Sequence, residues 1–121
     1  LTVARDLALT GYEVSIFDCG TKPGGMVRTQ IPKFRLPESV LDEECGYILD
    51  LGVKAHFNHW VKSLKDVLAE GWDAAFVGTG APRGRDADIP GRQEAAEHIH
   101  IGIDWLATVK QYESEVLSKR A

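Results

Sequence analysis

Apolar and polar positions in the first part of the chain follow two different periods, which predict a helix followed by a strand. Residues 1–10 carry an apolar face with helical spacing, formed by Leu1, Ala4, Leu7 and Ala8. Gly11 then suits a helix end, because glycine adopts the left-handed conformation at low cost. Residues 12–17 are rich in β-branched and aromatic side chains, which favours a strand. Residues 19–37 hold three glycines and three prolines, so we predict an ordered loop without helix or strand.

The alternation of helix and strand patterns continues through the middle of the chain. Residues 38–51 predict a helix whose core face consists of Val40, Leu41, Ile48 and Leu51. Residues 53–57 predict a second strand, and Ser63 suits the N-cap of a short helix that ends at Gly71. Residues 72–77 predict a third, buried strand that runs directly into Gly78, Thr79 and Gly80.

From about Glu94 onward the pattern is helical again, with an apolar face formed by Ile99, Ile103, Leu106 and Val109. Helices that alternate with strands are typical of the α/β class with a parallel sheet. We therefore predict a doubly wound, Rossmann-like nucleotide-binding domain over residues 1–93. Residues 94–121 are predicted to form a helical connector toward a further domain.

We expect this domain to be partial. The first predicted helix has no N-cap residue, and the chain does not begin with Met. A dinucleotide-binding domain starts with a central strand and a glycine-rich fingerprint, and the chain contains neither before its first helix. The chain is therefore interpreted as a fragment. Loss of a central strand leaves strand edges unpaired, so we also expect self-association.

Composition excludes several classes of function. The 121 residues carry a formal net charge of −4, which argues against a nucleic-acid or anionic-membrane partner. No apolar run approaches the roughly 20 residues that cross a bilayer. The two cysteines, Cys19 and Cys45, form no CxxC motif and are too few for a disulfide framework, so a reduced, cytoplasmic protein is expected.

The residues with a possible cofactor role follow the first predicted strand. Asp18 ends that strand, where an acidic residue of a dinucleotide fold accepts hydrogen bonds from the adenosine ribose; taken alone, it could equally be an ordinary polar residue at a strand end. Gly24 and Gly25 would let the backbone approach a diphosphate closely, although an ordinary turn also explains them. Arg35 lies on a loop bracketed by prolines and suits an anion, or else a surface ion pair with Asp42 or Glu38.

Other polar patterns carry less information. The histidine pairs at positions 56 and 59 and at positions 98 and 100 have no accompanying carboxylate or thiolate cluster, so no metal site is predicted. Arg83, Arg85 and Arg92 form a basic loop that is either solvated or in contact with a pyridine nucleotide of a neighbouring domain. No Ser-His-Asp or paired-carboxylate spacing is present, and no catalytic side chain is predicted.

Three segments together carry a resemblance to a known family: IFD at residues 16–18, GGM at residues 24–26 and IPKFRLP at residues 31–37. They resemble the FAD domain of the glutamate synthase small (beta) subunit and the flavin domain of dihydropyrimidine dehydrogenase. Further matches are LDLGVK, DAAFVGTG and IPG, at residues 49–54, 73–80 and 89–91. The resemblance covers about residues 1–109; the family's first glycine fingerprint, its NADPH-binding domain and its cysteine-rich iron–sulfur segment are not in this chain.

The resemblance implies a role for nine residues. Asp18 would bind the FAD ribose, and Gly24, Gly25 and Met26 would line the diphosphate and ribityl. Arg35 would reach the flavin or its diphosphate, the backbone of Val61 would meet the adenine, and Gly78, Thr79 and Gly80 would close over the diphosphate. The resemblance also implies NADP as a second cofactor, held by a domain outside this chain. The partner would be a larger catalytic subunit or an iron–sulfur electron acceptor.

The sequence thus predicts part of an NAD(P)H-dependent flavin oxidoreductase in which the isolated chain is inactive. Two alternatives remain at this stage. The chain could be a non-catalytic binding module that retains the fold, or an NAD-only dehydrogenase domain in which Asp18 selects NAD. The glycine pair and the loop at residues 31–37 favour the flavin interpretation.

Overall fold

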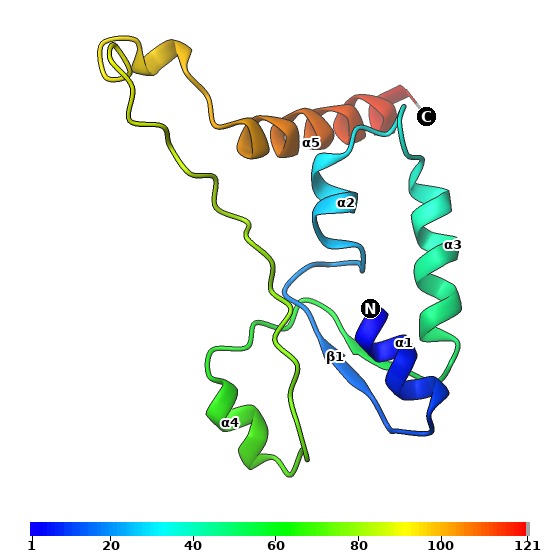
Figure 1. Ribbon diagram of the computed structural model, residues 1–121. Coiled ribbons are helices and arrows are strands. Elements are labelled where there is room, and N and C mark those ends of the chain that lie inside the picture. Colours follow the sequence, from blue (N-terminus) through cyan, green and yellow to red (C-terminus); the bar gives the residue numbers. More distant parts are fainter. Residues whose placement is uncertain (121) are drawn as a thin grey trace. The chain divides into compact units, whose positions relative to one another are not determined.

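The computed structural model describes residues 1–120 and has the mixed helix and parallel-strand content of the α/β class. Its elements appear in Figure 1 in chain order: α1 (Thr2–Leu9), β1 (Ser15–Phe17), α2 (Gly25–Gln30), α3 (Glu38–Leu49), β2 (Lys54–His56), α4 (Leu64–Ala69), the 3₁₀ turn η1 (Ala96–His98) and α5 (Gly102–Arg120). The α/β prediction is therefore confirmed at the level of class; the doubly wound topology stays a prediction.

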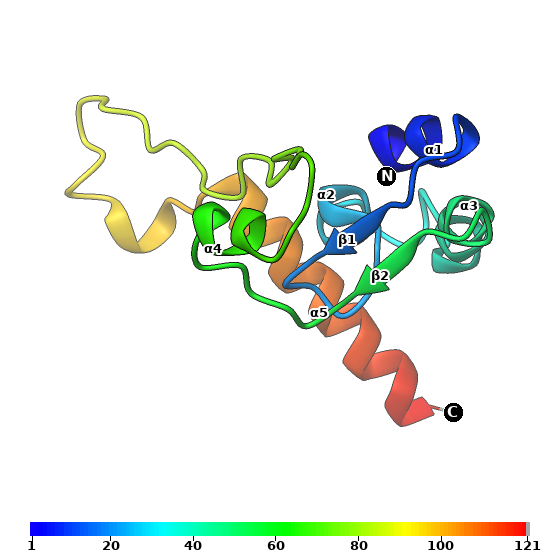
Figure 2. The ribbon, with the colours of Figure 1, turned by 90° about the horizontal axis from the view of Figure 1, so that it is seen from below.

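The sheet consists of β1 and β2, which run side by side in the same direction (Figure 2). Their register pairs Ser15 with Lys54 and Phe17 with His56. Parallel strands need a crossover connection between them, and here the chain between the two strands contains α2 and α3. The two predicted strands over residues 12–17 and 53–57 are thus confirmed, in shorter form.

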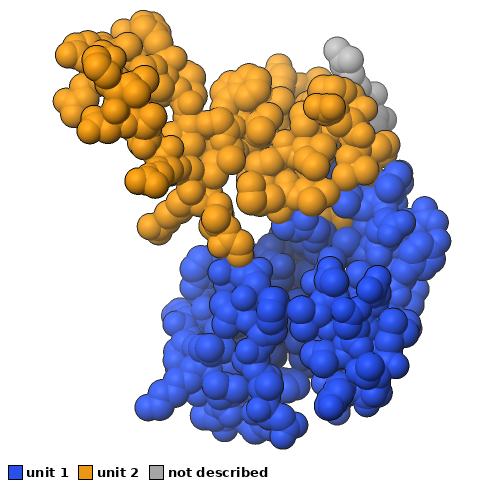
Figure 3. All heavy atoms as spheres, in the orientation of Figure 1, with its two compact units in different colours: residues 1–25, 38–79 blue, residues 26–37, 80–121 orange. Residues whose placement is uncertain are grey.

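The chain divides into two compact units (Figure 3). Unit 1 comprises Leu1–Gly25 and Glu38–Thr79, and contains both strands. Unit 2 comprises Met26–Pro37 and Gly80–Ala121. The boundary predicted at residue 93 stays a prediction.

The core of unit 1 corrects the predicted face of α3. Leu41 and Cys45 are buried there, together with Ala4 of α1 and Val53 beside β2. Residues four apart lie on one helix face, so Leu41 and Cys45 form one buried stripe. The sequence pattern placed Leu41 in the core correctly, and Ile48 is partly buried, but Val40 and Leu51, which it also placed there, are both 42% exposed. Cys45 was missed because a cysteine between glutamate and glycine gives little apolar signal.

The second correction is a helix inside the predicted loop at residues 19–37. Gly24 and Gly25 have positive φ values of 125° and 50°, which turn the chain and begin α2. Residues 26–30 that follow contain neither glycine nor proline, so nothing interrupts a helical turn before Pro32. The density of glycine and proline around this short helix concealed it.

The third correction concerns the strand predicted at residues 72–77. No strand forms there in the described chain, and Phe76 and Val77 are 73% and 59% exposed. β-branched and aromatic residues give only a preference for extended backbone, whereas a strand exists where another strand pairs with it. Residues 72–77 take part in no strand pairing with residues 1–120.

The last helix begins later than predicted. The pattern placed its start near Glu94, but α5 starts at Gly102 and only the 3₁₀ turn η1 precedes it. Ile99 has extended backbone angles, with φ −111° and ψ 114°, which separates the two. The predicted apolar face is otherwise retained, since Ile103, Leu106 and Val109 are all partly buried.

Candidate functional site

The candidate site lies at the carboxyl end of the two parallel strands. Backbone pairing continues past the strands themselves: the Asn58 amide donates to the Gly20 carbonyl at 2.8 Å, and the His59 amide donates to the Asp18 carbonyl at 2.9 Å. Residues 18–20 and 57–59 therefore lie side by side, and we call these two segments the carboxyl edge. Open α/β sheets bind their ligands at the carboxyl ends of their strands.

Asp18 supplies the charge of the carboxyl edge. Its side chain is half-buried, and Oδ1 accepts a hydrogen bond from the Gly20 amide at 2.7 Å. That bond closes a turn and orients the carboxylate. The other oxygen, Oδ2, has no hydrogen-bond donor within residues 1–120, so it can accept from a ligand hydroxyl.

Gly20 shapes this candidate site, and the sequence analysis missed it. A Cβ atom added to Gly20 would lie 3.1 Å from Asp18 Oδ1, closer than most side-chain contacts in proteins. Glycine at this position therefore lets the turn close tightly on the carboxylate. The sequence does contain a signal for it: a glycine two residues after an aspartate that ends a strand can close such a turn.

An aromatic cluster covers one side of the carboxyl edge. The Phe17 ring is stacked on the His56 ring with centroids 5.0 Å apart, and it contacts the His59 ring at the same separation. Trp72 meets Phe17 edge-on at 6.0 Å. The HxxH spacing thus places two imidazoles on one phenyl ring, an arrangement that the sequence did not reveal.

The same cluster contains a buried donor. The Trp72 indole Nε1 is buried, and no hydrogen-bond acceptor within residues 1–120 reaches it. No group of three or more histidine, cysteine or acidic side chains that could hold a metal ion occurs among the described residues.

The nine predicted cofactor residues are divided between the two units. Six belong to unit 1: Asp18, Gly24, Gly25, Val61, Gly78 and Thr79. Of these, Val61 follows the carboxyl edge by two residues and is 38% exposed, and the stretch containing Gly78 and Thr79 has no regular structure. Three belong to unit 2: Met26, Arg35 and Gly80. The nine assignments stay predictions.

The loop at residues 31–37 is turned back on itself. The amides of Arg35 and Leu36 both donate to the Pro32 carbonyl, at 3.0 and 3.2 Å. The turn leaves Phe34 81% exposed and Arg35 exposed. Asp42, one of the two carboxylates considered for pairing with Arg35, forms an ion pair with Lys22 at 3.3 Å.

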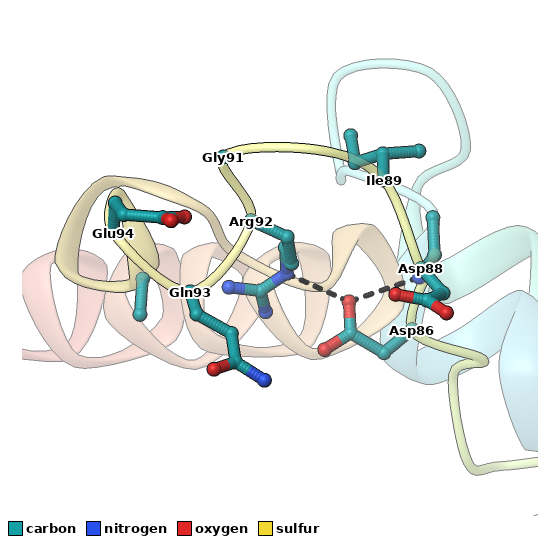
Figure 4. A pocket seen from close by; sticks show the side chains of 9 residues that line it. Asp86, Asp88, Ile89, Gly91, Arg92, Gln93 and Glu94 are labelled. Atoms are coloured by element: carbon teal, nitrogen blue, oxygen red, sulfur yellow. Dashed lines mark hydrogen bonds and ion pairs between the residues drawn. The ribbon is translucent and has the colours of Figure 1, made fainter.

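Unit 2 also has an open pocket of about 530 Å³, which nine residues between Asp86 and Ala96 line (Figure 4). Arg92 and Asp86 point toward each other across it, and Arg92 Nε lies 2.8 Å from Asp86 Oδ1. Asp88 and Glu94 also line the pocket. The carboxylates offset the charge of Arg92, so the basic loop noted in the sequence is not uniformly basic at this end.

The ion pair in this pocket gives a pH prediction. The hydrogen bond from Arg92, with a further bond from the Ala87 amide, holds the pKa of Asp86 below its ordinary value. A lowered folded-state pKa stabilises the fold above the unfolded-state pKa of about 3.9, and this contribution is lost as pH falls through the folded-state pKa. Arg92→Gln should therefore return the Asp86 pKa toward its ordinary value.

Carboxyl chemical shifts measured by NMR during acid titration test this prediction, with Arg83→Gln as a control on the same loop. An Asp86 titration curve that is unchanged by Arg92→Gln would contradict it. Because the Asp86 side chain is 56% exposed, the effect on overall stability should be small.

No protein-family model matches the chain. Curated relatives do. The chain is 35% identical over 124 residues to the NAD-dependent dihydropyrimidine dehydrogenase subunit PreT homolog of Salmonella typhi, a match that covers the whole chain. It is 33% identical over 111 residues to the glutamate synthase [NADPH] small chain of Azospirillum brasilense, and 33% identical over 108 residues to the NADP(+)-dependent formate dehydrogenase subunit beta of Moorella thermoacetica. The last two matches cover 89% and 88% of the chain.

The matched segment is a minor part of each relative: 29% of the PreT homolog, 22% of the glutamate synthase small chain and 15% of the formate dehydrogenase subunit. Within the described residues, no helix has the length and apolar character needed to span a bilayer. The matches confirm the resemblance that the IFD, GGM and IPKFRLP segments carry. Over most of its length the chain is thus related to the family of NAD(P)-dependent oxidoreductase subunits that includes PreT and the glutamate synthase small chain.

Proposed function

We propose that this chain is the part of an NAD(P)H-dependent oxidoreductase that binds FAD. The observation that carries the proposal is the carboxylate of Asp18. It stands at the carboxyl end of a parallel strand, one oxygen is held by the Gly20 amide, and the other has no donor within residues 1–120. A carboxylate in this position is the group that accepts hydrogen bonds from an adenosine ribose.

The residues present fit such a cofactor in two further respects. Gly24 and Gly25 adopt positive φ values that favour glycine, and the absence of a side chain at both positions leaves room for a diphosphate near the backbone. Arg35 is exposed on a turned loop and carries a fixed positive charge with several donors, which suits a phosphate or the flavin. In this proposal Met26 lines the ribityl, the Val61 backbone meets the adenine, and residues 78–80 close over the diphosphate.

Bound FAD would supply the redox chemistry, accepting a hydride and releasing single electrons. This chain would bind and orient the cofactor, and no acid or base from it is required. The nicotinamide cofactor, NADP or NAD, would bind to residues outside this chain. Electrons would leave toward iron–sulfur clusters or a larger partner subunit; the names of the relatives, which are enzyme subunits, support a partner.

The isolated chain is proposed to be inactive. The described sheet has two short strands, and residues 73–77 are exposed and take part in no strand pairing with residues 1–120. A cofactor held at a sheet edge needs a rigid sheet beneath it. Exposed apolar strand sequence also promotes association, so self-association of the isolated chain belongs to the proposal.

The proposal is tested on the protein that contains this segment at its full natural length. We expect the purified protein to show flavin absorbance in the visible range, and the pigment released by denaturation to be FAD. Reduction by NADH and by NADPH, followed as bleaching of that absorbance, identifies the electron donor. A colourless protein that takes up no FAD on reconstitution would overturn the proposal and favour a binding module that retains the fold.

A further inference from the structure

Lys110 of α5 is a buried charged residue of unit 2, with only 6% of its surface exposed. Its Nζ donates a hydrogen bond of 2.7 Å to the Ile31 carbonyl, 79 residues earlier in the chain. Lysine is almost never fully buried unless its ammonium group has partners, because desolvation of the charge is unfavourable. The bond to Ile31 is charge-assisted and therefore stronger than a neutral one.

A second residue of the same helix holds the same loop. Glu113 is three positions after Lys110, so the two side chains lie on one face of α5. The Lys33 amide donates to Glu113 Oε2 at 3.4 Å. Ile31 and Lys33 both precede Arg35 in the loop at residues 31–37, and Figure 1 shows α5 passing beside α2 at the point where this loop begins.

The two contacts act at the base of the loop, whereas its tip remains accessible. The turn closed by Pro32 leaves Phe34 and Arg35 exposed beyond these anchors. A guanidinium is most effective against an anion when its backbone is already fixed, because less freedom is then lost on binding. The base of this loop is fixed by a cation and an anion from a helix that the sequence analysis treated as a connector.

We propose that Lys110 and Glu113 form a clamp that orders the loop at residues 31–37 and positions Arg35 for its anionic ligand. Both are positioning residues, since neither is proposed to touch the ligand. The identity of this ligand as the diphosphate or flavin of FAD rests on the proposed function. The ordering of the loop rests only on the contacts from α5.

Trypsin digestion of the full chain tests the clamp, because Lys33 and Arg35 are themselves trypsin sites in the loop. Lys110→Met keeps most of the side-chain length and removes the donor. Loss of this charge-assisted hydrogen bond should increase the fraction of molecules in which the loop is open, and the cleavage rate is proportional to that fraction. We therefore expect cleavage after Lys33 and Arg35 to become about tenfold faster. Gln111→Ala, an exposed neighbour on α5, should leave both rates unchanged.

Glu113 provides a matched pair that does not depend on a buried lysine. Glu113→Ala removes the acceptor and should speed the same two cleavages, whereas Glu113→Gln keeps an acceptor oxygen and should not. Equal loop cleavage in Glu113→Ala and Glu113→Gln would overturn the clamp. So would an acceleration in Lys110→Met that is equally large at Lys65, in unit 1, since that result reports general unfolding.

Titration of the full-length protein with FAD tests the positioning of Arg35. If wild type binds FAD, Lys110→Met should weaken binding and Arg35→Ala should abolish that effect, because the clamp acts through Arg35. If Lys110→Met weakens FAD binding just as much when Arg35 is already replaced by alanine, the positioning role is overturned. If wild type binds no FAD, the proposed function fails, and the cleavage rates still decide whether the clamp exists.

Discussion

Replacement of Asp18 by alanine should weaken FAD binding to the full-length protein by about 10- to 100-fold. Hydrogen bonds to a charged group contribute about 1.5–3 kcal/mol, which corresponds to that range of dissociation constants. The Asp18 carboxylate is already oriented by the Gly20 amide, so little of this free energy is lost in ordering the side chain. Asp18→Asn keeps the shape of the carboxylate without its charge and should fall between wild type and alanine.

Fluorescence of FAD during titration measures this effect. Asp73→Ala is the matched control, because Asp73 is also an aspartate of unit 1 but is exposed and has no hydrogen bond within residues 1–120. The affinity of the Asp73→Ala variant for FAD should equal that of wild type. If Asp18→Ala binds FAD as tightly as Asp73→Ala, the carboxyl edge of this sheet is not where the ribose binds.

Replacement of Leu41 by alanine should lower the free energy of unfolding by about 2–4 kcal/mol, the range for truncating a buried leucine. Leu41 is 9% exposed in the core of unit 1. Val40→Ala, one position away on the exposed side of α3, should cost less than about 1 kcal/mol. The two variants test whether Val40 shares the core face with Leu41, as the sequence predicted, or lies outside it, as in the structure.

Urea unfolding followed by circular dichroism near 222 nm provides both free energies. Similar losses for Leu41→Ala and Val40→Ala would mean that the two positions are equally buried, as the sequence pattern implied. A larger loss for Val40→Ala would contradict the assignment of the core stripe to Leu41 and Cys45.

Local signals in the sequence were sufficient for most of the elements in unit 1. Gly11 and Gly52, which end the first and third helices, both have positive φ values that glycine adopts cheaply. Ser63 caps α4 as predicted, accepting a hydrogen bond from the Asp66 amide at 3.3 Å. Such caps involve residues within four positions of each other, so a linear sequence contains all of the information they need.

Features that depend on distant partners could not be found this way. The sequence contains Gly20, but only the closure of its turn on Asp18 makes a side chain there unfavourable. His56 and His59 are brought together by ring contacts with Phe17, which lies about 40 positions earlier in the chain. The strand predicted at residues 72–77 failed for the opposite reason, since its composition favours extended backbone but pairing requires a neighbour.

The sequence by itself determined that this is an α/β chain, that Asp18 ends a strand, and that the family of oxidoreductase subunits is the relevant one. These conclusions depend on local periodicity and on motifs that need no knowledge of packing. Only the tertiary structure decided that Asp18 has one oxygen without a donor within residues 1–120 and that Lys110 donates a hydrogen bond to the Ile31 carbonyl. Both are properties of contacts between segments, and a hydrogen bond across 79 residues leaves no periodic trace in the sequence.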